Sequence, residues 1–151
     1  MSPARRSARG WRTLCEITLP AEPGNDRMAV ETVSAALRTL PLSPERLERL
    51  KIAVAEATLN ALEHGSGYQS EHPIVIQVRA SDQALKIGIT NNGEQDIPAV
   101  TAVPDLAAKL AGQQTPRGWG FFLIEHMVDE VQISNQPGRH TIELYLYLEG
   151  A

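Results

Sequence analysis

The sequence predicts a two-layer α/β sandwich, in which a mixed and mostly antiparallel sheet carries helices on one face. Strand-like segments come in adjacent pairs joined by short links, which is typical of antiparallel hairpins. Only three segments have the length of long helices, and a sheet covered on both faces would need more. The 151 residues, 42% of them hydrophobic and 21% charged, are enough for one domain with its own core.

The first predicted elements are a strand and a helix. Polar residues interleaved with apolar ones predict a strand from Leu14 to Leu19, which Pro20 ends. The helix is expected to begin at Asn25, a good N-cap residue, and to run to about Leu40.

The second helix has clear signals at both ends. Ser43 is a preferred N-cap, and Pro44 suits the first helical position, where a backbone N–H would have no partner. Gly65 is a natural stop. Between them an apolar stripe recurs at steps of three and four residues: Leu47, Leu50, Val54, Ala57 and Ala61.

The second half of the chain is predicted to hold two hairpins and one helix. Strands at Ile74–Ala80 and Leu85–Thr90 are close enough to form the first hairpin. Residues 91–118 have no regular pattern, and a loop of that length in a compact domain is a functional lid or is disordered. The segment GWGFFLIEHMVDEV then becomes helix-like, and VQIS and TIELYLYL form the last hairpin around a turn at residues 136–139.

Residues 1–12 are expected to form a flexible, basic N-terminal tail, and residues 13–151 the folded domain. The tail holds Arg5, Arg6, Arg9 and Arg12 among serine, proline and glycine. A solvated terminus accounts for so short a basic run better than an arm that binds nucleic acid or a partner.

Composition limits the classes of function. A net charge of −4 gives no overall field for holding nucleic acid or an anionic membrane. Cys15 is the only cysteine, so an internal disulfide is impossible, and we expect a small core residue there. No apolar run approaches the ~20 residues of a membrane span and no signal-type segment opens the chain, so we expect a cytoplasmic protein.

The stretch EATLNALEHG puts Glu56, Asn60 and His64 four residues apart, in one row along the predicted helix. The row could be the solvated edge of an amphipathic helix, and taken alone that interpretation is favoured. In a functional site, the carboxylate could deprotonate a nucleophile and the amide oxygen could bind Mg²⁺. His64, at the helix end, suits the helix dipole and is expected to be structural.

Two further segments carry polar and glycine residues where elements end or begin. In ITNNGE, a strand ends at Asn91 and Gly93, residue types that are common in turns. The same pair could bind a nucleotide base, because the polar side chain could contact the edge of the base and the glycine, without a Cβ, would let the flat ring approach. In TPRGWG, Gly118 and Gly120 precede a helix, whose free backbone N–H groups could bind phosphate with help from Arg117. A simple loop-to-helix turn explains the second segment equally well.

Together, in this order, these segments resemble the ATP-site motifs of the GHKL ATPases. LKIAVAEATLNALEHG and GWGFFLIEHMVDEV are similar to the first and glycine-rich motifs of the small anti-sigma factor serine-protein kinases, and the resemblance covers about residues 14–149. It implies the GHKL (Bergerat-type) fold and a kinase that uses ATP and Mg²⁺. It also implies a sigma factor or other regulator as partner, a serine or threonine of an antagonist protein as substrate, and a homodimer.

The resemblance also implies residue roles. Glu56 would be the general base, Asn60 would coordinate Mg²⁺, and Gly93 would lie against adenine. Residues 94–117 would form the lid over ATP, and Thr141 would help to hold the base edge. The amides around Gly118 and Gly120, with Arg117, would bind the phosphates.

Asn91 departs from the family pattern, which has an aspartate that accepts from the adenine amine. The carbonyl of Asn91 could still accept, and its NH₂ could face a ring nitrogen. The exchange is expected to cost about 1 kcal/mol, a five- to tenfold loss of affinity.

Two other functions stay open. A protein-interaction module that kept the fold without kinase activity is favoured by Asn91 and opposed by Glu56, Asn60, Gly118 and Gly120. A histidine-kinase catalytic domain is disfavoured because no upstream phosphoacceptor helix pair is expected, so that it would have to act in trans.

Overall fold

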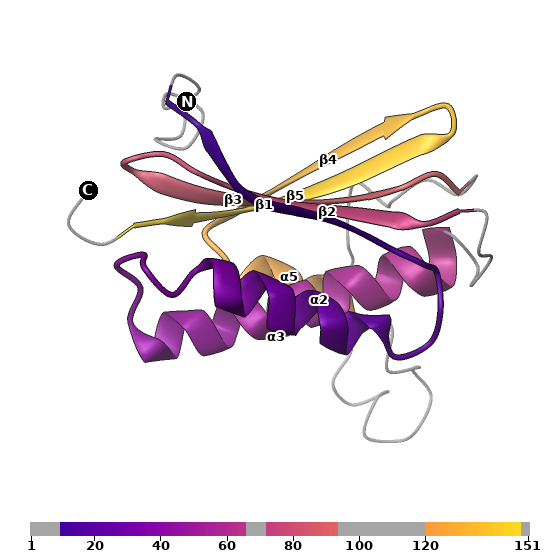
Figure 1. Ribbon diagram of the computed structural model, residues 1–151. Coiled ribbons are helices and arrows are strands. Elements are labelled where there is room, and N and C mark those ends of the chain that lie inside the picture. Colours follow the sequence, from indigo (N-terminus) through magenta and orange to yellow (C-terminus); the bar gives the residue numbers. More distant parts are fainter. Residues whose placement is uncertain (1–9, 66–71, 94–119, 149–151) are drawn as a thin grey trace.

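The computed structural model describes residues 10–65, 72–93 and 120–148, and within these ranges it is a two-layer α/β sandwich (Figure 1). Five strands form one sheet in the order β1-β2-β3-β5-β4, and the helices cover one face of it. Every neighbouring pair of strands is antiparallel, so the predicted fold class is confirmed, with no parallel pair in this sheet. The elements are β1 (Arg12–Leu19), α2 (Asn25–Ala36), α3 (Pro44–Asn60), the π-helical turn η1 (Ala61–Gly65), β2 (Ile74–Ala80), β3 (Ala84–Asn91), α5 (Gly120–Met127), β4 (Glu130–Gln136) and β5 (Arg139–Tyr147).

The two long helices differ in how well their ends were predicted. Helix α3 begins as expected, because the Ser43 hydroxyl accepts a hydrogen bond from the backbone N–H of Arg46 at 3.2 Å. Helix α2 instead has Gly24 as its N-cap, in the left-handed region at φ 92°, while the Asn25 side chain donates to the carbonyl of Pro20. It ends at Ala36 rather than near Leu40, since the next backbone N–H bonds only three residues back and tightens the last turn.

Arg12, which the sequence analysis placed in the N-terminal tail, is the first residue of β1. Trp11, just before this strand, meets the ring of Tyr145 edge-on, with 6.5 Å between ring centroids. The ammonium of Lys86 lies 4.8 Å from the centre of the Trp11 ring, within range of a cation–π interaction. These contacts, and the pairing of Arg12 with Ala80 across β1 and β2, attach residues 11 and 12 to the sheet.

The two faces of the sheet differ in chemistry. Side chains alternate between the faces, and those that meet α3 and α5 are apolar, among them Ile76, Ile87 and Ile89. We call this the helix-covered face. The other face, the open face, carries the polar contacts between Gln77 and Glu16 and between Lys86 and Glu143. The core clusters on the helix-covered face: Ala29, Val33, Leu50, Ala53, Val54, Ala57, Leu62, Ile124, Ile142, Leu144 and Leu146 complete its centre.

Cys15 packs against the core from β1, where it is partly buried, as expected for a small apolar side chain. Burial raises the pKa of the Cys15 thiol above its usual value. The thiol therefore stays protonated at neutral pH and is a poor nucleophile.

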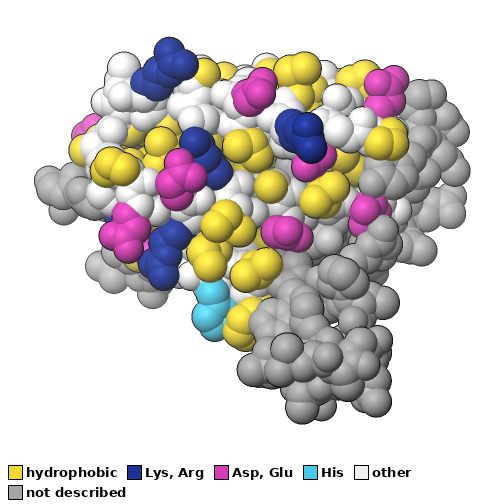
Figure 2. All heavy atoms as spheres, turned by 90° about the horizontal axis from the view of Figure 1, so that it is seen from below, with side chains coloured by type: hydrophobic (Ala, Val, Ile, Leu, Met, Phe, Trp, Pro, Cys, Tyr) yellow, Lys and Arg dark blue, Asp and Glu magenta, His cyan; other side chains and the backbone are white. Residues whose placement is uncertain are grey.

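The outer surface of the helix layer mixes acidic, basic and hydrophobic side chains (Figure 2). Met28 on α2 and Ile52 on α3 are the large apolar side chains most exposed in the described part of the chain. None of the helices described here is both long enough and apolar enough to cross a membrane.

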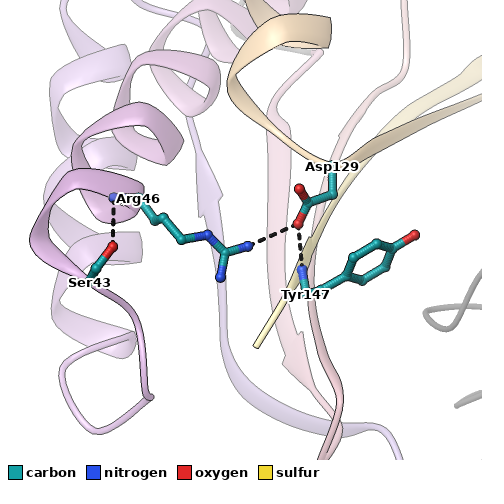
Figure 3. A network of polar contacts seen from close by, with 4 residues as sticks. All are labelled: Ser43, Arg46, Asp129 and Tyr147. Atoms are coloured by element: carbon teal, nitrogen blue, oxygen red, sulfur yellow. Dashed lines mark hydrogen bonds and ion pairs between the residues drawn. The ribbon is translucent and has the colours of Figure 1, made fainter. Parts of the chain in front are cut away.

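A polar network joins the start of α3 to the segment between α5 and β4 and to the end of β5 (Figure 3). The carboxylate of Asp129, just before β4, accepts from the Arg46 guanidinium at 3.0 Å and from the backbone N–H of Tyr147 at 2.7 Å. Since Asp129 follows α5 by two residues, the Arg46 contact holds the C-terminal end of α5 at the N-terminal end of α3. Helices α5 and α3 pack against each other, so the N-terminus of α5 is directed toward the C-terminal end of α3.

Candidate functional site

Glu56 and Asn60 lie one turn apart on the last part of α3, and both are half-buried. Asn60 is the last α-helical residue, and the chain continues directly into the π-helical turn η1. Short π-helical segments inside helices are frequent at functional sites. Glu56 and Asn60 therefore lie on the same α-helix, as predicted, whereas His64, the third residue of the predicted row, belongs to η1.

The Asn60 carboxamide is suited to a hard cation. Amide oxygens are ligands that Mg²⁺ accepts, and in the described part of the chain the Asn60 side chain makes no hydrogen bond. Glu56 adds a carboxylate one turn earlier. The pair therefore fits a bound magnesium ion together with a group that can take up a proton.

Asn91 and Gly93 form a closed turn at the end of β3. The Asn91 side chain is 2% exposed, and its Oδ1 accepts a hydrogen bond from the backbone N–H of Gly93 at 3.0 Å. Gly93 is buried as well. The π-helical turn η1, which continues α3, packs against β3, the strand that ends at this turn.

His140 is a site residue that the sequence analysis missed. It lies on β5 directly opposite Asn91 and is 1% exposed. Its Nε2 donates to the carbonyl of Gly93 at 2.9 Å, and its Nδ1 lies 2.9 Å from Oδ1 of Asn135. The ring therefore joins the end of β3 to the β4–β5 hairpin and holds Gly93 in place.

Thr141 lies on the open face, so the structure does not bring it together with Asn91 on the helix-covered face. Its hydroxyl is 2.8 Å from that of Thr90, its partner across the strand pair. Ile142 and Ile89 belong to the core, so the alternation of side chains turns Thr141 away from the helices and turns His140 toward them. His140, and not Thr141, is the residue of β5 that pairs with Asn91.

The N-terminus of α5 is the described part of the expected phosphate site. Helix α5 begins at Gly120 and has no acidic residue in its first turn. No carboxylate of that turn therefore competes with an anion for the backbone N–H groups at the helix N-terminus. Its direction points these groups toward the Glu56 and Asn60 end of α3. Arg117, Gly118 and the predicted lid at residues 94–117 lie outside the described residues.

A separate hollow of about 460 Å³ lies between α5 and the edge strand β4. None of the predicted site residues lines it, so it is not the site described above. Its lining is Phe121, Glu125, Asp129, Glu130, Val131 and Ile133.

The sequence is similar to known families along most of its length. Residues 19–146 match the model of the histidine kinase-like ATPase domain. The anti-sigma F factors of Bacillus thuringiensis (strain Al Hakam) and Bacillus mycoides (strain KBAB4) are each 33% identical to it over 135 residues. These alignments cover 84% of this chain and 87% of each relative.

Two solved structures share the fold. The RsbU and RsbW domains of Rv1364c from Mycobacterium tuberculosis superpose with a TM-score of 0.64 at 20% identity, covering 89% of this chain and 32% of that longer one. The SiaB–SiaC complex from Pseudomonas aeruginosa contains a chain with a TM-score of 0.64 at 16% identity, covering 89% of this chain and 90% of that one. At such identities the similarity concerns the fold alone.

Proposed function

The chain belongs to the histidine kinase-like ATPase domain family, and from that premise we propose that it is a nucleotide-dependent regulatory switch with protein kinase activity. It binds ATP with Mg²⁺, associates with a sigma factor or a similar regulator, and phosphorylates a serine or threonine of an antagonist protein. The observation that carries this proposal is the pair of Glu56 and Asn60, one turn apart and half-buried at the end of α3.

Glu56 is the proposed general base. Its carboxylate takes the proton of the attacking hydroxyl, from the protein substrate or from water, as phosphoryl transfer proceeds. Asn60 holds Mg²⁺ through its amide oxygen. The metal ion, when bound, neutralises phosphate charge, and the protein's task is chiefly to position the reacting groups.

The base and the phosphates are assigned to two other segments. Asn91 faces the base edge, and buried Gly93, which has no Cβ, allows a flat ring to approach. The backbone N–H groups at Gly120, with those of Gly118 and the charge of Arg117, bind the phosphates. Residues 94–117 are proposed as the lid.

A protein partner is supported by the names of the relatives. The 33% identical proteins are called anti-sigma F factors, and one structure with this fold was solved as a complex of two proteins. From the family resemblance we also propose that the chain acts as a homodimer in the cytoplasm.

Binding of Mg-ATP should raise the melting temperature of the purified chain by about 3–6 °C at a tenfold excess over Kd, because ligand binds only the folded state. Asn60→Ala should remove most of this shift, since it deletes the proposed Mg²⁺ ligand. Differential scanning fluorimetry measures both, and Asn92→Ala, at an exposed position near the site, is the matched amide control. No shift of the wild-type protein at millimolar Mg-ATP would favour an interaction module without kinase activity.

A further inference from the structure

The described sheet has two edge strands, β1 and β4, and they differ in how well they are protected. The pairing of β1 with β2 shifts in register between Thr13 and Cys15, an irregularity of the kind that discourages pairing with another strand. Strand β4 instead runs in unbroken register with β5 over Glu130–Gln136 and contains neither proline nor lysine. The outer side of β4 therefore presents a regular row of backbone groups that could pair with an extended segment.

The hollow between α5 and β4 has an acidic lining. Its three apolar residues pack against the core, and the other three are Glu125, Asp129 and Glu130. Asp129 accepts hydrogen bonds from Arg46 and from the backbone N–H of Tyr147 (Figure 3). Glu125 is exposed, and no basic residue is among the described residues that line the hollow. The hollow therefore suits a positively charged occupant.

The N-terminal segment enters the described structure close to this hollow. Trp11 meets the ring of Tyr145 at 6.5 Å between centroids, and Tyr145 lies directly opposite Glu130 in the pairing of β5 with β4. Tyr147 packs against the same cluster of side chains and donates its backbone N–H to Asp129. The residues that hold Trp11 are therefore immediate neighbours of two residues that line the hollow.

The chain before Gly10, residues 1–9, lies outside the described residues. It holds Arg5, Arg6 and Arg9 and no acidic residue. Gly10 itself has φ 94°, in the left-handed region that glycine adopts without strain and that allows the chain to turn sharply. Nine residues span up to about 30 Å, and neighbouring strands lie about 4.8 Å apart, so the segment is long enough to cross from β5 to the outer side of β4.

We propose that residues 1–9 dock along the free edge of β4, with arginine side chains bound to Glu125 and Glu130 at the hollow. Guanidinium and carboxylate groups form charge-assisted hydrogen bonds, and attachment at Trp11 raises the effective concentration of the segment. Two copies of the chain that paired through β4 would bring two acidic hollows to one edge, which repulsion between like charges opposes. The sequence alone favours a solvated tail, and the acidic hollow beside the residues that hold Trp11 is the observation that favours docking.

The position of the segment can be measured in the full chain with a spin label on Ser7→Cys, while Cys15→Ala removes the other thiol. In nuclear magnetic resonance spectra, the label should broaden the amide signals of Glu125 and Glu130 more strongly than that of Ala80. Ala80 pairs with the first residue of β1, so a segment without a docking site would broaden its signal at least as strongly.

Reversing the charge of the segment, with Arg5→Glu, Arg6→Glu and Arg9→Glu together, should lower the population of the docked state about fivefold, the size expected for the loss of two exposed ion pairs. Glu125→Lys in the same chain should restore part of the broadening, because it returns a pair of opposite charges. Arg9→Glu alone should have a smaller effect, and Arg38→Glu, the matched change at an exposed position after α2, should have none.

Equal broadening of Glu130 and Ala80, no broadening of either, or broadening that charge reversal leaves unchanged would overturn the docking of residues 1–9. A mixture of spin-labelled and isotope-labelled molecules tests whether the contact forms within one chain. Equally strong broadening in the mixture would mean that the segment of a second copy occupies the edge, and would also overturn the proposal. Because no nucleotide is present, none of these outcomes bears on the proposed function.

Discussion

Replacing Glu56 with glutamine is expected to slow phosphoryl transfer by about 10²- to 10⁴-fold, the usual contribution of a positioned general base. Glutamine has nearly the same size and keeps one acceptor oxygen, but its amide cannot take up the proton of the attacking hydroxyl. Glu56 is not assigned to bind the nucleotide base or Mg²⁺. Its replacement should therefore change nucleotide affinity by no more than about threefold.

Hydrolysis of the nucleotide by the purified chain provides a readout for Glu56→Gln that needs no identified substrate protein, and transfer to a cognate antagonist provides the second. Glu48→Gln is the matched control, since Glu48 lies on the same helix, is exposed and pairs with Lys51 on the surface. It should leave both rates unchanged. If Glu56→Gln hydrolyses the nucleotide and transfers phosphate at rates close to wild type, Glu56 is not the general base.

Replacing His140 with alanine is expected to lower the free energy of unfolding by about 2–4 kcal/mol. The substitution removes a ring that is 1% exposed, leaving a cavity, and it deprives the buried carbonyl of Gly93 of its donor. Urea unfolding monitored by circular dichroism measures the loss. Nucleotide affinity should fall as well, because the turn that directs Asn91 loses its contact with β5.

His126→Ala is the control for this substitution. His126 is exposed on α5, where it stacks on Phe122 with 4.0 Å between ring centroids, and its loss should cost about 0.5 kcal/mol. His140→Gln, whose amide can still donate, should recover part of the stability. A loss below about 0.5 kcal/mol in His140→Ala would mean that the ring does not hold the turn.

Elements with local signals could be predicted from sequence. The start of α3 depends on Ser43 and Pro44, whose effects act within one turn, and the hairpin of β2 and β3 depends on alternation and a short link. The end of α2 could not be predicted in this way. The apolar spacing continues to Leu40, but the backbone leaves the helix at Leu37, where the N–H bonds to Ser34.

The positions of site side chains depend on strand phase and on contacts between distant segments. Thr141 was assigned by resemblance, although the core positions Ile142, Leu144 and Leu146 already put residue 140 on the helix-covered face. That alternation was the signal that could have identified His140. Its bond to Gly93 joins residues 47 apart in sequence, and no local pattern predicts such a contact.

The most direct test of the central claim is whether Mg²⁺ and a nucleotide bind together at Asn60. Titration calorimetry of the wild-type chain with ATP, in the presence of Mg²⁺ and in the presence of EDTA, measures this coupling. We expect Mg²⁺ to raise the affinity for the nucleotide at least about tenfold in wild type, and no more than about twofold in Asn60→Ala. Equal affinities with and without Mg²⁺ in the wild-type chain, or no binding of ATP, would contradict a Mg²⁺-dependent nucleotide switch.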